Sequence, residues 1–166
     1  MRYISVDIPS GVSASLENGM MSMKGPKGSV KKGMRANGVE ISLKDNKFEV
    51  NGKNTEVINT LKRQVLKMVE GCTKGFSSTM IIRYSHFPIK VSIKGNVLVI
   101  DNFGGEKLQR RVNIIGDTKI KIAGQELVIE GPSRDDVSQT IANIRQKTKT
   151  KKKDSRVFQD GIYPVE

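Results

Sequence analysis

An internal repeat is the feature that most constrains how this chain can fold. Pro9 is matched by Pro88 and Gly25 by Gly104, and 88 minus 9 and 104 minus 25 both give an offset of 79 residues. A register held without insertion is typical of a duplicated unit, in which each copy repeats the same order of elements. The matched segments are Ile8-Pro9 and Phe87-Pro88, Val12 and Val91, Met20-Met21 and Val99-Ile100, Gly25 and Gly104, and Val50-Asn51-Gly52 and Ile129-Glu130-Gly131.

The first copy reads as short strands followed by one helix. Strands are expected where short, partly alternating apolar segments lie between Gly and Asn turns. Asn54 or Thr55 can cap a helix in which an apolar stripe at helical spacing runs from Val57 to Cys72. The expected strands are Ser5–Ile8, Met20–Lys24, Val39–Leu43 and Lys47–Val50.

The second copy follows the same plan. Ser133 is the expected helix cap, and Asp135 and Asp136 fall in the first turn, where the helix dipole favours negative charge. Val137, Ile141 and Ile144 form the core stripe of this helix. The expected strands are Thr79–Arg83, Ile89–Ile93, Asn96–Ile100, Arg110–Asn113, Ile120–Ile122 and Glu126–Ile129.

This order of elements predicts an α+β fold made of two tandem copies of a small domain. Each copy would be a mainly antiparallel sheet with one helix packed on it. The expected boundaries are residues 1–76 for the first repeat, 77–147 for the second, RNA-binding repeat, and 148–166 for a basic C-terminal tail that orders on RNA.

The charge points to a polyanionic partner. The chain has 29 Lys and Arg against 17 Asp and Glu, a formal net charge of +12 and a pI near 9.9, which is typical of nucleic-acid binding. An anionic membrane surface would require a basic amphipathic helix, and the basic residues lie mostly outside the helical patterns. Because the chain has one Cys and no long apolar run, we expect a cytoplasmic protein.

The strongest basic cluster is the stretch from Lys147 to Lys153, in which five of seven residues are Lys. Like charges repel and nothing apolar can fold the stretch, so it should be disordered alone and order against phosphates. A solvated linker or targeting tail is the alternative. Phe158 and Tyr163 follow it and could serve for packing or for stacking on a base.

Two further clusters are weaker. Lys107, Arg110 and Arg111 lie where a turn enters a strand, and alternation puts the two arginines on opposite faces. A solvated strand end is the alternative for them. The segment Lys24–Gly33 lacks the spacing of a phosphate-binding loop and no helix follows it, so a basic turn between strands is the better interpretation.

The residues needed for catalysis or for a metal site are missing from the pattern. His86 is the single His and is interpreted as a structural residue at a domain junction, while Cys72 falls on the apolar stripe of a helix. One His and one core Cys cannot form a zinc site, and no base, nucleophile and orienting acid are spaced together. We therefore expect no enzyme, no metal and no cofactor.

Four motifs in order carry a family resemblance. They are Lys24-Gly25-Pro26-Lys27-Gly28, Tyr84-Ser85-His86-Phe87-Pro88-Ile89, Asn102-Phe103-Gly104-Gly105-Glu106-Lys107 and the ending Lys153-Asp154-Ser155-Arg156-Val157-Phe158-Gln159-Asp160-Gly161-Ile162-Tyr163. Together they resemble the universal large-subunit ribosomal protein six family, in its archaeal and eukaryotic branch, called protein nine in eukaryotic ribosomes. The resemblance covers essentially the whole chain.

The resemblance implies a structural protein of the large ribosomal subunit. Its second copy and tail would bind 23S-type ribosomal RNA near the sarcin–ricin loop and the base of the factor-binding stalk, and the first copy would project towards the surface. Neighbouring ribosomal proteins at the stalk base would be partners, with translational GTPases nearby. The candidate RNA-binding residues are Lys107, Arg110, Arg111, Lys147, Lys149, Lys151, Lys152, Lys153, Arg156 and Tyr163.

Three other functions compete with this hypothesis. A free RNA-binding regulator or assembly chaperone shares all the charge evidence, and cofractionation with mature large subunits would separate the two. A nucleic-acid-processing enzyme would need a metal or acid–base cluster. A peripheral membrane protein would need the basic amphipathic helix that the pattern lacks.

Overall fold

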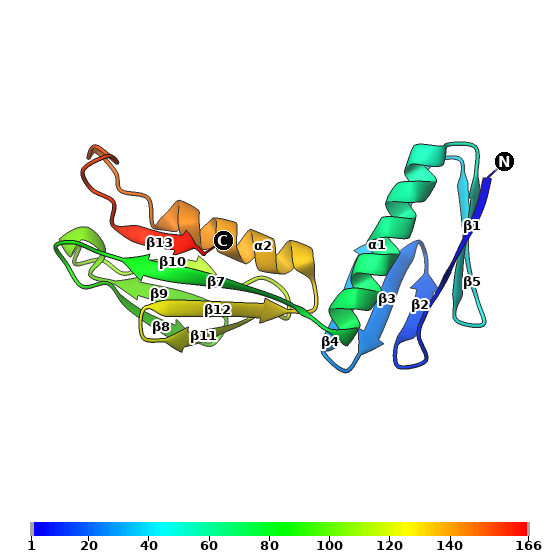
Figure 1. Ribbon diagram of the computed structural model, residues 1–166, viewed down its shortest axis with the longest axis horizontal. Coiled ribbons are helices and arrows are strands. Elements are labelled where there is room, and N and C mark those ends of the chain that lie inside the picture. Colours follow the sequence, from blue (N-terminus) through cyan, green and yellow to red (C-terminus); the bar gives the residue numbers. More distant parts are fainter. Residues whose placement is uncertain (1, 166) are drawn as a thin grey trace. The chain divides into compact units, whose positions relative to one another are not determined.

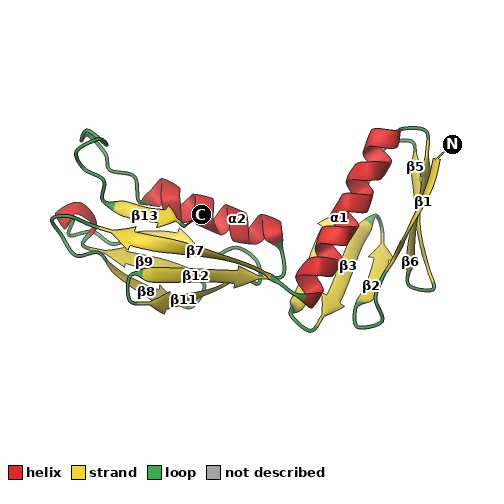
Figure 2. Cartoon of the chain, viewed as in Figure 1, coloured by secondary structure: helices red, strands yellow, loops and turns green. Residues whose placement is uncertain are grey.

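A computed structural model describes residues 2–165 of the chain and divides it into two compact units, Met1–Gly75 and Phe76–Glu166 (Figure 1). We call these unit 1 and unit 2. Both are α+β, with mainly antiparallel strands and one α-helix each (Figure 2), as the sequence predicts for the fold class. Residues 1 and 166, the outer ends of the expected first repeat and tail, lie outside the described residues.

Unit 1 has two antiparallel sheets of three strands each, with the orders β1-β6-β5 and β2-β3-β4. Its hairpins between β2 and β3 and between β5 and β6 have both central residues at positive φ, Asn18 with Gly19 and Asp45 with Asn46, which suits the twist of paired strands. The elements are β1 (Arg2–Asp7), β2 (Ser13–Glu17), β3 (Met20–Gly25), β4 (Gly28–Gly33), β5 (Val39–Lys44), β6 (Lys47–Gly52) and α1 (Thr55–Thr73).

Helix α1 covers both sheets of unit 1 and forms the core with them. It packs against β1, β3, β4 and β6, and the side-chain oxygen of Asn54 accepts a hydrogen bond from Glu56 N at 3.1 Å. The predicted stripe is therefore confirmed. Its fully buried members are Ile58, Leu61, Val65, Met68 and Cys72, whereas Val57 and Val69 are partly buried at its margin.

Unit 2 contains sheets with the orders β8-β9-β10 and β11-β12-β7-β13. Ser133 caps its helix as predicted, with Ser133 Oγ accepting from Asp136 N at 3.3 Å. The elements are β7 (Phe76–Arg83), β8 (Lys90–Lys94), β9 (Val97–Asp101), a 3-10 turn (Phe103–Gly105), β10 (Arg110–Asn113), β11 (Lys119–Ala123), β12 (Glu126–Gly131), α2 (Arg134–Lys147) and β13 (Gly161–Pro164).

The two units pair their strands in the same order, but the constant offset is wrong for the early strands. Ile8 N donates to Asn46 O, and Ile82 N donates to Gln125 O. Because 125 minus 46 gives 79 but 82 minus 8 gives 74, Ile8 corresponds to Ile82 and not to Phe87. The loop of residues 84–89 is longer than the loop of residues 8–12, so the matched prolines do not lie at equivalent places.

Two strands of unit 1 were not predicted. Strand β2 was missed, and the basic turn expected over Lys24–Gly33 is a turn at Pro26 and Lys27 only, with β4 following it. The pattern of β4 is weak because Val30 is its one buried side chain, between exposed Ser29 and Lys31. A single apolar residue gives too little alternation to indicate a strand.

The expectation that the tail orders only on RNA is also wrong for its last part. Residues Gly161–Pro164 form β13, an antiparallel strand beside β7 in the four-stranded sheet of unit 2. Ile162 is only 1% exposed, and Val165 N donates to Thr79 O at 2.9 Å. Burial of Ile162 and backbone pairing thus order this segment without a partner.

Candidate nucleic-acid interface

Three segments meet at one end of unit 2, and hydrogen bonds join them. Asn102 Nδ2 donates to Pro88 O at 3.1 Å, and Ser85 N donates to Asp160 Oδ1 at 2.9 Å. Figure 1 shows the segments together at one end of the sheets of unit 2. We call this surface the loop end, and it consists of residues 84–89, 102–109 and 148–160.

Arg110 is the most engaged of the predicted site residues. Its Nε and Nη2 atoms donate to the two carboxylate oxygens of Glu106 at 2.9 and 2.5 Å. Its Nη1 atom donates to Lys147 O at 2.6 Å and to Lys149 O at 3.1 Å. The guanidinium carbon lies 4.0 Å from the centroid of the Phe103 ring. With 13% of its side chain exposed, Arg110 is part of the protein's own structure.

Arg111 and Lys107 differ from Arg110 because both are exposed. The alternation expected along β10 is therefore confirmed, with Arg110 turned inwards and Arg111 outwards. The hydrogen bond from Arg110 holds the pKa of the Glu106 carboxyl below its usual value. That carboxylate stays charged at neutral pH, and Arg110 offsets its charge beside Lys147–Lys153, which we call the basic segment.

The basic segment presents its lysines to solvent. Its two threonines turn inwards, and Thr148 Oγ1 donates to Ile144 O at 2.9 Å at the end of α2. Thr148 is buried and Thr150 is partly buried, whereas every lysine of the segment is exposed, so the positive charge lies on the surface. The exposed lysines are Lys147, Lys149, Lys151, Lys152 and Lys153.

Arg156 and Tyr163 have partners within the protein. Arg156 Nη2 lies 3.3 Å from Asp154 Oδ2, and both side chains are largely or partly exposed. The backbone hydrogen bond from Arg156 N lowers the pKa of the Asp154 carboxyl. Tyr163 Oη donates to Gln159 O at 3.0 Å, which holds the turn before β13. Arg156 keeps exposed donors for a ligand, whereas the Tyr163 hydroxyl already has an acceptor.

The loop end also carries exposed apolar side chains that the sequence pattern did not single out. Tyr84 and Phe87 come from the 84–89 loop, Leu108 from the 102–109 loop and Val157 from the segment after the lysines. Leu108 is 82% exposed and Val157 is 69% exposed, so neither contributes to the core. These exposed side chains come from all three segments of the loop end. Their sequence signal was weak because single apolar residues in loops are common.

The sequence pattern predicted that His86 lies at a domain junction, and this prediction is wrong, because the two units divide between Gly75 and Phe76. His86 lies in the 84–89 loop of unit 2, and its ring centroid is 5.7 Å from that of Phe158 at an interplanar angle of 36°. Lys153 Nζ lies 4.4 Å from the centroid of the same Phe158 ring. The His-Phe-Pro motif and the basic segment therefore belong to one surface.

Other features of the described residues offer little for catalysis. Within residues 2–165, no group of three or more His, Cys, Asp or Glu residues is placed to hold a metal ion. No helix in this range is long and apolar enough to cross a membrane. Cys72 is buried, and burial raises the pKa of its thiol.

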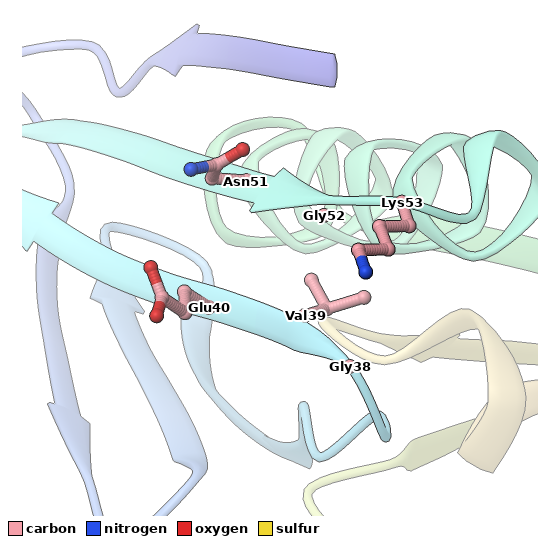
Figure 3. A pocket seen from close by; sticks show the side chains of 6 residues that line it. All are labelled: Gly38, Val39, Glu40, Asn51, Gly52 and Lys53. Atoms are coloured by element: carbon pink, nitrogen blue, oxygen red, sulfur yellow. The ribbon is translucent and has the colours of Figure 1, made fainter. Parts of the chain in front are cut away.

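A pocket lies in unit 1, where β5 begins and β6 ends (Figure 3). Its polar side chains are one carboxylate, one amide and one ammonium group, which form no catalytic arrangement. The lining residues are Gly38, Val39, Glu40, Asn51, Gly52 and Lys53.

Comparison with known proteins identifies the family. The family model described as ribosomal protein L6 matches residues 87–161, which include most of the loop end. The large ribosomal subunit protein uL6 of Methanosarcina mazei is 40% identical over 167 residues, covering 98% of this chain and 95% of the relative. The uL6 protein of Haloquadratum walsbyi is 37% identical, covering 98% and 94%, and that of Thermoplasma volcanium is 39% identical, covering 96% and 93%. The chain therefore belongs to the ribosomal protein L6 family.

Proposed function

We propose that this protein is a structural constituent of the large ribosomal subunit and that it binds ribosomal RNA through the loop end of unit 2. The names of the relatives support the ribosomal role. The observation that carries the RNA contact is the fixed basic segment with five exposed lysines, from Lys147 to Lys153. The protein would shape RNA and would catalyse no reaction.

The mechanism combines charge with a preformed shape. Lysines that neutralise phosphates release counterions, and this release drives binding without reading the base sequence. Because hydrogen bonds hold the chain at Lys147 and Lys149 and again at Asp160 before binding, less conformational entropy is lost than for a disordered tail. The exposed rings and aliphatic side chains beside it suit ribose and unstacked bases, which RNA-binding proteins commonly contact.

We place the RNA site near the sarcin–ricin loop and the base of the factor-binding stalk, as the family resemblance implies. Ribosomal proteins at the stalk base would be neighbours, translational GTPases would act nearby, and unit 1 would face the surface of a cytoplasmic ribosome. We also propose that the two units arose by duplication. Their shared strand order supports this, as do helix caps 79 residues apart at Asn54 and Ser133.

The test uses point substitutions, because removal of residues 148–166 would also remove β13. Binding of a large-subunit RNA fragment that spans the sarcin–ricin region is measured across a salt series. Replacement of Lys149, Lys151, Lys152 and Lys153 by Gln should weaken binding. The salt slope should fall by about 0.7–0.9 for each phosphate that a lysine no longer neutralises.

The control replaces four exposed lysines of unit 1, Lys24, Lys27, Lys31 and Lys44, by Gln. It should retain most of the affinity. Equal decreases in the two variants would mean that net charge and not the loop end drives binding. No decrease in either would place the RNA site elsewhere. Cofractionation of the wild-type protein with mature large subunits distinguishes a constituent from an assembly chaperone.

A further inference from the structure

Arg110 occupies a place that a core valine holds in unit 1. Arg110 pairs with Ile100 of the neighbouring strand. Arg110 lies four residues before Ile114, whose backbone N–H donates to Asn96 O. In unit 1, Val30 pairs with Met23. Val30 likewise lies four residues before Met34, whose backbone N–H donates to Gly19 O. The two positions are equivalent in the register of the corresponding strands. An arginine therefore stands where the fold requires only an apolar side chain.

The surroundings of Arg110 come from a longer connection between strands. In unit 1, β3 and β4 are joined by Pro26 and Lys27 alone. In unit 2, residues 102–109 join β9 and β10 and supply Phe103 beneath the guanidinium and Glu106 beside it. A fork of donors held by an aromatic ring and a carboxylate has a fixed direction. The remaining Nη1 atom is directed at the end of α2.

The helices of the two units are also capped differently. At the end of α1, Cys72 O accepts a backbone hydrogen bond from Lys27 N at 3.1 Å. At the end of α2, Lys147 O and Lys149 O accept from the Arg110 side chain. The last carbonyls of a helix need such donors, and a cation there also favours the helix dipole. Arg110 thereby fixes the direction in which the chain leaves α2.

The chain that follows the basic segment is fixed independently. The Asp160 carboxylate is buried and accepts a hydrogen bond from Ser85 N, and Gly161 pairs with Arg83. Residues 150–159 thus span two anchored points, and Arg110 provides the one nearer to the lysines. Loss of the hydrogen bonds from Arg110 would free the basic segment, whereas Asp160 and β13 would stay in place.

We propose that Arg110 is a positioning residue for RNA binding: its guanidinium contacts no phosphate but holds the carbonyls of Lys147 and Lys149, so that the following lysines face one phosphate path. This inference rests on the proposed function of the loop end. It differs from the role implied by the family resemblance, in which Arg110 itself contacts RNA. The two roles give different salt dependences.

The decisive variants are Arg110→Val and Arg110→Lys. Valine is what the equivalent strand of unit 1 carries, so the sheet should tolerate it, and lysine keeps the charge but loses the fork. Both should weaken binding of the sarcin–ricin fragment on the order of tenfold, because the segment must be ordered on binding. The salt slope should remain that of the wild-type protein. A slope lowered by about 0.7–0.9 in Arg110→Val, with affinity restored by Arg110→Lys, would overturn the proposal.

Arg35→Val is the matched control. Arg35 in unit 1 also binds a backbone carbonyl, since its Nε and Nη2 atoms donate to Asn18 O at 3.0 and 2.7 Å. Its replacement removes the same kind of hydrogen bond far from the basic segment in the sequence, and RNA affinity should be unchanged. A decrease equal to that of Arg110→Val would show a general effect of destabilisation and would overturn the inference.

Amide hydrogen exchange of the free protein separates failure of the inference from failure of the proposed function. In Arg110→Val, exchange over residues 149–159 should accelerate while β9 and β10 remain protected. Unchanged exchange in that segment would overturn the positioning role, whatever happens to RNA affinity. If the wild-type protein does not bind the RNA fragment, the proposed function fails, and with it the RNA part of the inference.

Discussion

Units 1 and 2 have the same strand order and differ at the edges and in the loops. Strand β1 pairs only with β6 within the described residues, whereas β7 pairs with both β12 and β13. Because Ile8 and Asn46 form a hydrogen-bonded pair, alternation directs the backbone groups of Tyr3, Ser5 and Asp7 away from β6. Unit 2 has covered the corresponding edge with its own chain.

The loops of unit 2 hold what unit 1 lacks. The 84–89 loop is longer than its counterpart, residues 102–109 replace a two-residue turn, and residues 148–160 join α2 to β13. All three belong to the loop end. One scaffold therefore supports a different surface in each unit, and function has to be argued from these additions and not from the shared sheets.

The largest expected change in the free energy of unfolding comes from Ile162→Ala, which weakens the packing of β13, the strand that has no counterpart in unit 1. Ile162 is 1% exposed, and removal of a buried isoleucine side chain costs about 2–5 kcal/mol. Urea unfolding followed by hydrogen exchange should show the decrease in unit 2. Ile4→Ala in β1, where Ile4 is partly buried, should cost less. No cost for Ile162→Ala would mean that β13 adds nothing to the stability of its sheet.

The second prediction moves the arginine into unit 1. Val30→Arg should lower the free energy of unfolding by about 1–3 kcal/mol, because unit 1 has a two-residue turn where unit 2 supplies a ring and a carboxylate. Val30→Met is the control for size and should cost less. A Val30→Arg protein as stable as the wild type would show that the connection in unit 2 is not needed to hold an arginine.

The third prediction compares the helix caps. Asn54→Ala and Ser133→Ala each remove one side-chain acceptor from a helix N-terminus. Each should cost about 1 kcal/mol, and thermal unfolding with amide exchange should locate each effect in its own helix. Asn54→Asp and Ser133→Thr keep an acceptor and should retain most of the stability. A cap variant that loosens the other helix would contradict local capping.

The smallest effects are those of pH. Hydrogen bonds from Tyr3 and Arg110 lower the pKa values of the Glu49 and Glu106 carboxyls. The contributions of these two hydrogen bonds to the free energy of unfolding should be complete above about pH 4.3, the ordinary pKa of Glu. They should be lost as the pH falls through the lowered pKa values. Carboxyl chemical shifts in an NMR titration measure both, and an ordinary value for either carboxyl would contradict its hydrogen bond.

Unit 1 should also respond at alkaline pH. The hydrogen bond to Glu49 raises the pKa of Tyr3. The contribution of this hydrogen bond to the free energy of unfolding is therefore complete below about pH 10, the ordinary pKa of Tyr, and is lost as the pH rises through the raised pKa. Ultraviolet absorbance of the tyrosines measures this, with Tyr3→Phe as the control.

The sequence indicated local features well and long-range ones poorly. The buried face of α1 follows from its helical period, and the cap at Ser133 from its residue type and the acidic turn after it. Strand β4 was missed because one apolar residue leaves no alternation. The strand containing Ile162 was missed because its partner β7 is distant in sequence.

The exposed lysines of the candidate site were found from composition, whereas the role of Arg110 was not. Its neighbours Phe103 and Glu106 are close in sequence, but the carbonyls it binds are more than 30 residues further on. No spacing rule predicts such a hydrogen bond. His86 and Phe158 were likewise brought together only by the fold.

The position of β13 in the sheet has a consequence for the order in which the two units can fold during synthesis. Synthesis runs from the N-terminus, and early domains fold first. The sheets of unit 1 are complete once residue 52 has emerged, since Arg2 pairs with Gly52, whereas Arg83 must wait for Gly161. Until then the nascent chain carries β7 with an unpaired edge, which is a template for aggregation. In every newly made molecule this edge of β7 therefore stays open to pairing with another chain until Gly161–Pro164 have emerged, whereas among the described residues the outer edge of β1 stays unpaired in the finished fold.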